Sequence, residues 1–175
     1  MTTFAKLSTT APKEGKLGMK FVNLTDDNGP HCFKVESPKI IFEPSVYNGT
    51  GEEERKNIVM AITEEAAKEI EELENWTRIR VGVTPEKWNS CVKRVNGPQL
   101  KAKINMSGQR QCEFAGHNGA KVAPTYLRGR SATAAILVRG VYMQRNAAGL
   151  MIDVVALRYG EVEKDGQESY LQMVM

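Results

Sequence analysis

The chain has 175 residues, of which 41% are hydrophobic and 26% are charged, and its formal net charge is +3. This length fits one domain that buries a core of its own, and the composition is that of an ordinary globular protein. No run of about 18 apolar residues is present, so no membrane-spanning helix is predicted. The N-terminus lacks the continuous apolar stretch of a secretory signal, and we therefore expect an intracellular protein, in the cytoplasm or nucleus.

The first fifty residues predict a flexible arm followed by extended structure. Residues 1–17 are small and polar with scattered lysines, a composition typical of a mobile segment. Short apolar or alternating runs come next, separated by clusters of turn residues. They predict strands over residues 19–24, 31–37 and 39–44.

The middle of the chain predicts two helices. Over residues 52–76 apolar side chains recur every three or four positions, while glutamates occupy the other faces. Thr63 is suited to cap a new start within this stretch. A strand is expected over 77–83, followed by a second, shorter helix over 85–95, where Pro85 suits the first helical position.

The remainder of the chain predicts β-structure. Residues 100–106 alternate between apolar side chains and lysines, so Lys101 and Lys103 are expected on one face of a strand. A turn is expected at the Asn-Gly pair, residues 118–119.

Two long apolar runs, 135–143 and 150–159, flank the loop QRNAAG and are predicted to form strands. Each contains one arginine, Arg139 or Arg158, which we interpret as a rim position that faces an anion. Together the elements predict an α+β domain over residues 18–160, with mostly antiparallel strands and two inserted helices.

The cysteines and histidines indicate neither a disulfide framework nor a metal site. Cys32, Cys91 and Cys112 are odd in number and widely spaced, which favours reduced thiols. His31 adjoins Cys32 and His117 follows Cys112 by five residues, but no CxxC or HxxxH spacing occurs. We expect no metal and no other cofactor.

Charge is distributed unevenly along the chain. Residues 78–145 carry thirteen lysines and arginines against two acidic residues, whereas residues 51–77 carry three against nine. Like charges at this density repel one another unless an anion relieves them. These cations could simply form a solvated basic face of the protein. Alternatively, they could form a surface that binds a polyanion.

Cations at alternate positions of a strand point to one face, as is expected of Lys101 and Lys103, of Arg78 and Arg80, and of Arg128 and Arg130. Phosphates are the commonest partner of such a face. Aromatic side chains lie among these cations, and stacking of bases on such rings is worth about 1–3 kcal/mol per base. Each ring could instead belong to the core, and we favour Tyr126 and Tyr142 for stacking. The candidate nucleic-acid-binding residues are Arg78, Arg80, Lys93, Arg94, Lys101, Lys103, Arg110, Lys121, Tyr126, Arg128, Arg130, Arg139, Tyr142 and Arg145.

The sequence contains no recognisable catalytic motif and no motif for the recognition of double-stranded DNA. Neither histidine lies in a Ser–His or Cys–His arrangement, no GxxxxGK[ST] loop is present, and the basic region has few carboxylates for a nuclease metal. Neither predicted helix is basic along a face, which favours single strands over duplex. We expect no enzyme; a small enzyme that uses Cys112 or His117 is the weakest alternative.

The series LKAKINM, QCEFAGHNG, KVAPTYLRGRS and ATAAILVRGVYMQRNAAGLMIDVVALRYG resembles the latter half of the OB-fold single-stranded-DNA-binding proteins of tailed phages and large DNA viruses. The resemblance covers roughly residues 100–168 and implies an OB-like β-barrel. It further implies that the DNA groove is lined by Lys101 and Lys103, the loop with Arg128 and Arg130, and the hairpin around Arg145.

The leading hypothesis is therefore a non-enzymatic protein that binds single-stranded DNA, or RNA, without sequence specificity during replication, recombination or repair. The acidic, partly flexible segment over 161–175 resembles the tail with which such proteins recruit replication proteins. A homo-oligomer is compatible with the sequence, no membrane is expected, and a viral protein would act in its host cell. The alternative is a viral or phage structural or assembly protein with a basic, genome-facing surface.

Overall fold

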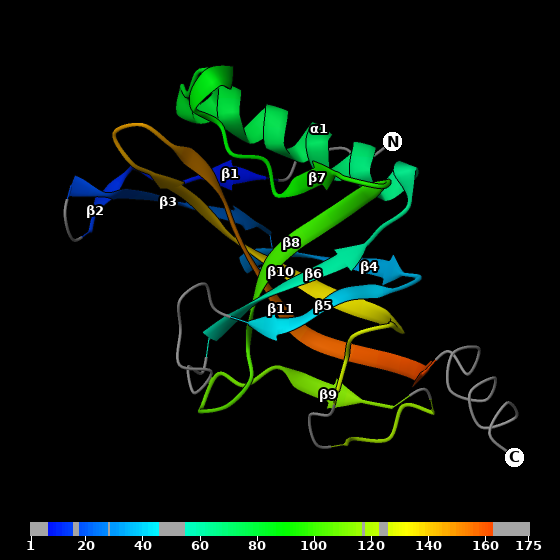
Figure 1. The fold of residues 1–175 in the computed structure, drawn as a ribbon. Coiled ribbons are helices and arrows are strands. Elements are labelled where there is room, and N and C mark those ends of the chain that lie inside the picture. Colours follow the sequence, from blue (N-terminus) through cyan, green and yellow to red (C-terminus); the bar gives the residue numbers. More distant parts are fainter. Residues whose placement is uncertain are drawn as a thin grey trace, which may run out of the picture.

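Strands dominate the structure, a computed structural model that describes residues 7–15, 18–27, 29–45, 55–116, 118–122 and 126–162 (Figure 1). One mixed sheet follows the order β1-β3-β4-β10-β11-β8-β6-β5, with β2 beside β3, β7 beside β8 and β9 beside β11. The strands are β1 (Ser8–Thr9), β2 (Lys13–Glu14), β3 (Lys20–Asp26), β4 (Gly29–Ser37), β5 (Ile40–Ser45), β6 (Arg55–Ala61), β7 (Val92–Arg94), β8 (Pro98–Asn105), β9 (Glu113–Ala115), β10 (Arg130–Met143) and β11 (Ala148–Val162). The described ranges also contain one α-helix, α1 (Glu64–Val81), and a 3-10 turn at Pro85–Lys87.

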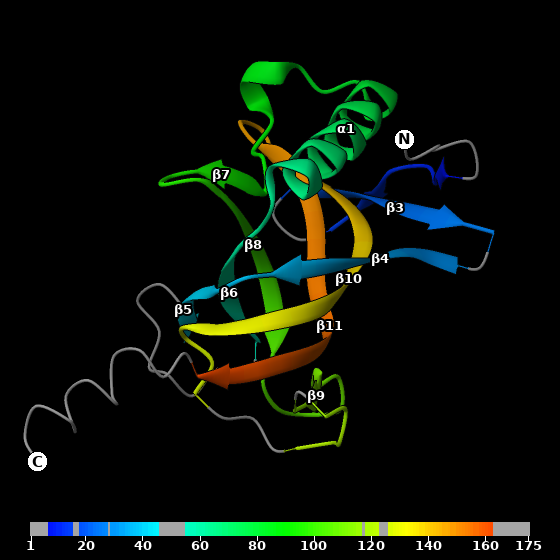
Figure 2. The same cartoon turned by 90° about the vertical axis from the view of Figure 1, so that its right-hand side faces the viewer.

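The long hairpin of β10 and β11 holds the sheet together (Figure 2). Its strands pair antiparallel, as the two apolar runs predict. Along its other edge β10 pairs with β4 through residues 132–138 and with β3 through residues 140–143. Strand β11 pairs in parallel with β8 and with β9, which makes the sheet mixed. Strands from both halves of the chain therefore meet on this one hairpin.

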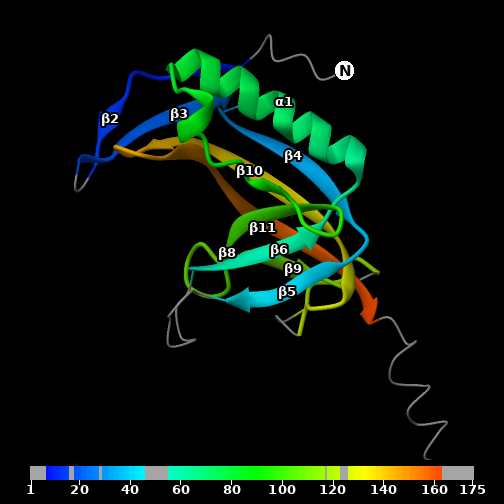
Figure 3. The same cartoon turned by 45° about the horizontal axis from the view of Figure 1, so that its top comes forward.

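The core lies on the apolar face of the sheet, and helix α1 contributes to it. Strand β10 buries every second side chain from Ala132 to Val138, the alternation of a sheet with one apolar face. Helix α1 adds Ala67, Ile70 and Leu73 to the same core and lies across one end of the sheet (Figure 3). Each fully buried Ile or Leu contributes about 1.5–3 kcal/mol relative to an exposed one.

The first predicted helix is wrong in its N-terminal part. Residues 55–61 form β6, which pairs with β5 and β8, whereas the helix was expected over 52–76; residues 52–54 lie outside the described residues. Ile58 fits the helical spacing, but Ile58 and Met60 are both buried with the period of a strand. Pairing on both edges of β6 overrides the local helical pattern.

Helix α1 begins at a cap and ends at a left-handed glycine. Thr63 accepts a hydrogen bond from a first-turn backbone N–H at 3.1 Å, and Gly82 has a φ of 75°. The expected strand over 77–83 is therefore wrong, because the helix continues to Val81. Thr77 is buried on the core face of α1, and its hydroxyl donates to the carbonyl of Leu73 at 2.7 Å.

The second predicted helix is also wrong. Of residues 85–95, only Pro85–Lys87 form a turn of 3-10 helix, and β7 follows and pairs with β8. Trp88 forms an isolated bridge with Ala148 at the hairpin of β10 and β11. Cys91 and Val92 are buried, whereas Val95 is 60% exposed, so the apolar residues of this stretch do not share one helical face.

The hydrogen-bonded order does not close on itself within the described residues. Strands β1 and β5 end the order, so the sheet is open and the closed barrel implied by the resemblance is not confirmed. The β5 edge is irregular: its register against β6 shifts twice, it contains Pro44, and Ile40 accepts from the backbone N–H of Gly129 at 2.8 Å.

Two terminal segments were expected to be flexible. Residues 7–15 of the expected arm contribute β1 and β2, which pair with β3, and Leu7 is buried. Most of the acidic segment, residues 163–175, lies outside the described residues. In the described part of the chain, no helix is long and apolar enough to cross a membrane.

Gly140 marks the point where β10 changes its partner from β4 to β3. Its φ is 152°, and a Cβ added there would lie 1.9 Å from the backbone oxygen of Val22. Real Cβ atoms do not approach backbone so closely, so any side chain would force β3 and β10 apart.

We expect Gly140→Ala to lower the free energy of unfolding by about 3 kcal/mol or more, because it disrupts a backbone contact in the middle of the sheet. Gly119→Ala is the control, since Gly119 has a φ of 81° but no atom within 4 Å of an added Cβ. That control retains only the cost of left-handed backbone, about 1–2 kcal/mol. Urea unfolding measures the free energy of unfolding of both variants. Equal losses for Gly140→Ala and Gly119→Ala would contradict a close backbone contact at Gly140.

Candidate nucleic-acid interface

A groove of about 420 Å³ opens beside β7 and β8. Its lining comes from β6, β7 and β8, from the loop 89–91 and from the part of the hairpin near residues 142 and 150–152. No aspartate or glutamate is among the described residues that line it. Its cations and its aromatic side chain are Arg55, Lys93, Lys101, Lys103 and Tyr142.

The floor of the groove uses the alternation predicted for β8. Lys101 and Lys103 are exposed, and the apolar residues between and beside them are buried. Asn57 of β6 lies opposite Lys103, and Val59 lies opposite Lys101. Because directly opposite residues share a face of the ladder, these side chains form two rows across the strands.

Positive charges crowd at Lys103. Partial burial lowers the pKa of its ammonium group, and repulsion from Arg55 and Lys101 lowers it further, while Asp153 acts in the opposite direction. An anion placed among these side chains would stabilise the charged lysine. The groove therefore favours a negatively charged ligand.

The carboxylate of Asp153, whose charge acts on Lys103, is already shared by two arginines. Arg55 donates to both oxygens of Asp153, at 2.8 and 3.2 Å, and Nε of Arg139 donates to Oδ2. Asp153 is 2% exposed, whereas the two arginine side chains are 45% and 36% exposed. One carboxylate thus pairs with two guanidinium groups, so the cluster of Arg55, Arg139 and Asp153 has a net charge of about +1 beside Lys103.

Sequence reasoning missed Arg55 and Asp153. Asp153 did carry a signal, since it is the only charged residue within the apolar run 148–157. Arg55 follows three glutamates in an acidic stretch, where no pattern of alternate cations points to it. Arg139 was predicted to face an anion at a rim, and the anion that it meets is Asp153 of the same chain.

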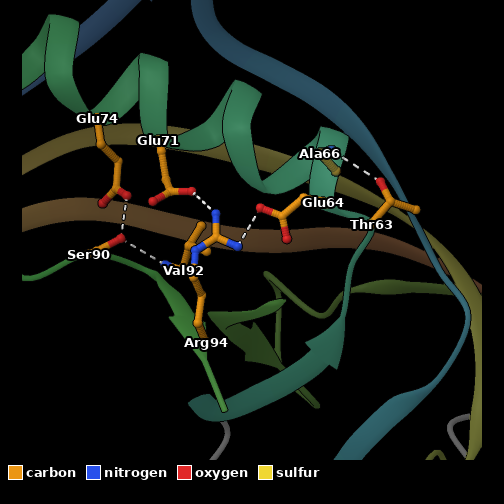
Figure 4. A network of polar contacts seen from close by, with 8 residues as sticks. All are labelled: Thr63, Glu64, Ala66, Glu71, Glu74, Ser90, Val92 and Arg94. Carbon is orange, nitrogen blue, oxygen red and sulfur yellow. Dashed lines mark hydrogen bonds and ion pairs between the residues drawn. The ribbon is translucent and has the colours of Figure 1, made fainter. Parts of the chain in front are cut away.

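A buried glutamate holds one wall of the groove against α1. Glu74 is 3% exposed and accepts from Nε1 of Trp88 at 3.0 Å, from Oγ of Ser90 at 2.5 Å and from the backbone N–H of Cys91 at 3.1 Å. Figure 4 shows the contact with Ser90, whose hydroxyl in turn accepts from the N–H of Val92 at 3.1 Å. These hydrogen bonds fix the loop 89–91, which lines the groove, to helix α1.

Thiol chemistry finds no support at Cys112. Burial, and then the charge of Glu113, raises the pKa of its thiol to about 12. The thiolate is the nucleophile, so this thiol is inert near neutral pH. His117 lies outside the described residues, and the described residues contain no cluster of three or more potential metal ligands.

No family model and no curated protein sequence matches the chain. Solved structures do match. Gp2.5, a single-stranded DNA binding protein encoded by bacteriophage T7, has a TM-score of 0.57 at 13% identity, covering 84% of this chain and 96% of that one. The single-stranded DNA-binding protein from bacteriophage Enc34, as a C-terminal truncation, has a TM-score of 0.56 at 12% identity, covering 90% and 96%.

The chain shares the fold of two phage single-stranded-DNA-binding proteins. The resemblance noted over residues 100–168 is thereby confirmed at the level of the fold, and it extends well beyond that region. The matches also support an OB-like arrangement of the strands.

The two predicted cations of β7 point in opposite directions. Lys93 lines the groove, whereas Arg94 contacts Glu64, at 2.6 Å, and Glu71 on α1 (Figure 4). Neighbouring residues of a strand face opposite sides. Arg94 therefore ties β7 to the helix and lies outside the groove lining.

Arg78 and Arg80 do not form a strand row, because both lie in the last turn of α1. Arg78 donates to the carbonyl of Val83 at 3.0 Å, and the guanidinium of Arg80 lies 5.2 Å from the ring centre of Trp76. Cations at this end of a helix are stabilised by the helix dipole.

Most of the other predicted residues lie away from the groove lining. Arg130 donates to the carbonyls of Tyr126 and Gly160 and stacks on Tyr159 at 5.2 Å. Tyr126 and Arg128 are exposed in the loop beside β5, Arg110 is exposed after β8, and Arg145 is exposed in the turn between β10 and β11. Lys121 and Arg158 line a separate cavity of about 320 Å³ near β9, at the opposite end of the molecule from α1 (Figure 1).

The network at Glu74 predicts a pH-dependent contribution to stability. Burial raises the pKa of Glu74 above its ordinary value of 4.5, although hydrogen bonds from Ser90, Trp88 and Cys91 partly oppose this shift. The folded protein therefore binds this proton more tightly than the unfolded chain. The contribution is complete below the unfolded-state pKa and is lost as the pH rises through the folded-state pKa.

We expect the free energy of unfolding of the wild type, relative to that of Glu74→Gln, to fall as the pH is raised from 4.5 towards neutrality. Urea unfolding of both proteins across this range measures the difference. Glu72→Gln, at an exposed position of the same helix, controls for the loss of one charge. If the difference in free energy of unfolding between the wild type and Glu74→Gln stays constant with pH, the raised pKa of Glu74 is contradicted.

Proposed function

We propose that the protein binds single-stranded DNA in the groove beside β7 and β8 and catalyses no reaction. The observation that carries this proposal is the gathering of Arg55, Lys93, Lys101 and Lys103 around one groove, with no acidic side chain among its described lining residues. The shared fold with two phage proteins that bind single-stranded DNA supports the choice of ligand.

The chemistry of these cations favours binding without sequence preference. Lysine and arginine that meet phosphates neutralise the backbone and release its counterions, which contributes most of non-specific affinity. Sequence is read by contacts to base edges, and phosphate contacts carry no such information. RNA offers the same phosphates and remains a second ligand of the same class.

Tyr142 is our candidate for stacking within the groove. Its side chain is half-buried, it lines the groove, and it lies opposite Gly149 in the hairpin. An added Cβ at Gly149 would lie 3.0 Å from the Tyr142 hydroxyl and 2.7 Å from the backbone oxygen of Asn89. This glycine leaves room for the tyrosine ring beside the loop 89–91.

We further propose a role in replication, recombination or repair of viral DNA, because the two similar structures described above are phage proteins. The acidic residues after position 160 would suit contacts with basic surfaces of replication proteins, and self-association along a strand would suit a coating protein.

Binding to a dT oligonucleotide should weaken steeply with salt. Each phosphate neutralised on a single strand contributes about −0.7 to the slope of log K against log salt concentration, so three to four contacts predict a slope of roughly −2 to −3. Fluorescence anisotropy between about 50 and 200 mM salt measures it. A flat response would exclude a phosphate-lined groove.

Replacing Lys101 and Lys103 together with alanine should lower affinity for the same oligonucleotide and reduce the magnitude of the salt slope by up to about 1.4. Stability should change little, because both side chains are exposed. Lys39→Ala with Lys68→Ala is the matched control, since both lysines are exposed and neither lines the groove. Equal effects of the two double variants would show that net charge, and not the groove, governs binding.

A further inference from the structure

A large apolar side chain is exposed on β5, an edge strand of the sheet that lies two strands away from β8 of the groove. Phe42 of β5 is 54% exposed, whereas Ile40 and Pro44 on the same strand are buried. The other large hydrophobic side chains that are exposed among the described residues lie at the end of α1 or in loops. Core packing therefore does not account for a phenylalanine at this position.

The register of the sheet places Phe42 on the face that carries the groove lysines. Between the two register shifts of β5, Phe42 lies opposite Val59 of β6, and Val59 lies opposite Lys101 of β8. Directly opposite residues share a face, so the three side chains form one row. Neighbouring strands are about 4.8 Å apart, so the strand of Phe42 lies roughly 10 Å from the strand of Lys101.

This row is cationic at one end and apolar at the other, which matches the two parts of a nucleotide. A single strand has a charged backbone on one side and flat apolar base faces on the other. Within the described residues no ring or guanidinium stacks on Phe42, whereas Trp76 and Tyr159 are each covered by an arginine. Because the Phe42 side chain is 54% exposed, part of its ring is accessible to a ligand.

We propose that Phe42 is a stacking platform for a base of a strand whose phosphates lie along Lys101 and Lys103. This inference rests on the proposed function and adds to it a contact that only unpaired bases can make. Bases in a duplex are stacked on one another and cannot lie flat on a ring at the protein surface. Phe42 would thus contribute to the preference for single strands over duplex.

Two fluorescent oligonucleotides with the same number of phosphates separate stacking from charge: oligo-dT and an abasic strand. We expect Phe42→Ala to weaken binding of oligo-dT roughly five- to hundredfold, the range for loss of one stacked base, and to leave abasic binding unchanged. Phe42→Tyr should bind like the wild type, and Phe42→Leu should behave like the alanine variant. Ile79→Ala, at a side chain 69% exposed on the end of α1, is the control and should change neither.

Several results would overturn the inference. Unchanged oligo-dT binding by Phe42→Ala would do so, as would equal losses on both strands, which would indicate a general effect on the groove. Altered sedimentation with unaltered DNA binding would instead assign Phe42 to a contact between copies of the chain. If the wild type binds neither oligo-dT nor the abasic strand, the proposed function is wrong as well. That outcome is seen with the wild type alone and is therefore distinct from a failure of the Phe42 proposal.

Discussion

The charge of Asp153 in the middle of the sheet is the constraint on which the groove depends. A buried carboxylate without partners would be strongly destabilising, and removal of one partner from a buried ion pair typically costs about 3–5 kcal/mol. Arg55 and Arg139 satisfy this carboxylate from two other strands. Because one anion cannot neutralise two cations, the arrangement that stabilises the sheet also leaves positive charge at its surface.

The parts of the fold that follow a local rule could be predicted from the sequence. The alternation of Lys101 and Lys103 with apolar neighbours gave both the strand and the exposed face, because side chains on a strand have a period of two. The long hairpin was predictable from a different signal, two continuous apolar runs around a short polar loop, which are typical of buried strands. Thr63 was also recognised as a helix cap from its position before the glutamates.

The remaining features depend on contacts between distant residues, which no local pattern encodes. Arg55 and Asp153 are 98 positions apart, and Glu74 meets Ser90 across 16 positions through a loop. The apolar spacing near Ile58 fits a helix, but residues 55–61 form a strand because they pair with β5 and β8. Arg78 and Arg80 fitted a strand row equally well, and only the continuation of α1 to Gly82 places them at a helix end.

The irregular β5 edge has a consequence for contacts between copies of the protein at high local concentration. An open sheet offers unpaired backbone groups that can template the addition of a strand from another molecule. Here two register shifts, Pro44 and the backbone of Gly129 interrupt that template. A high local concentration, such as the proposed binding of several copies to one nucleic acid would create, therefore does not favour strand addition at this edge.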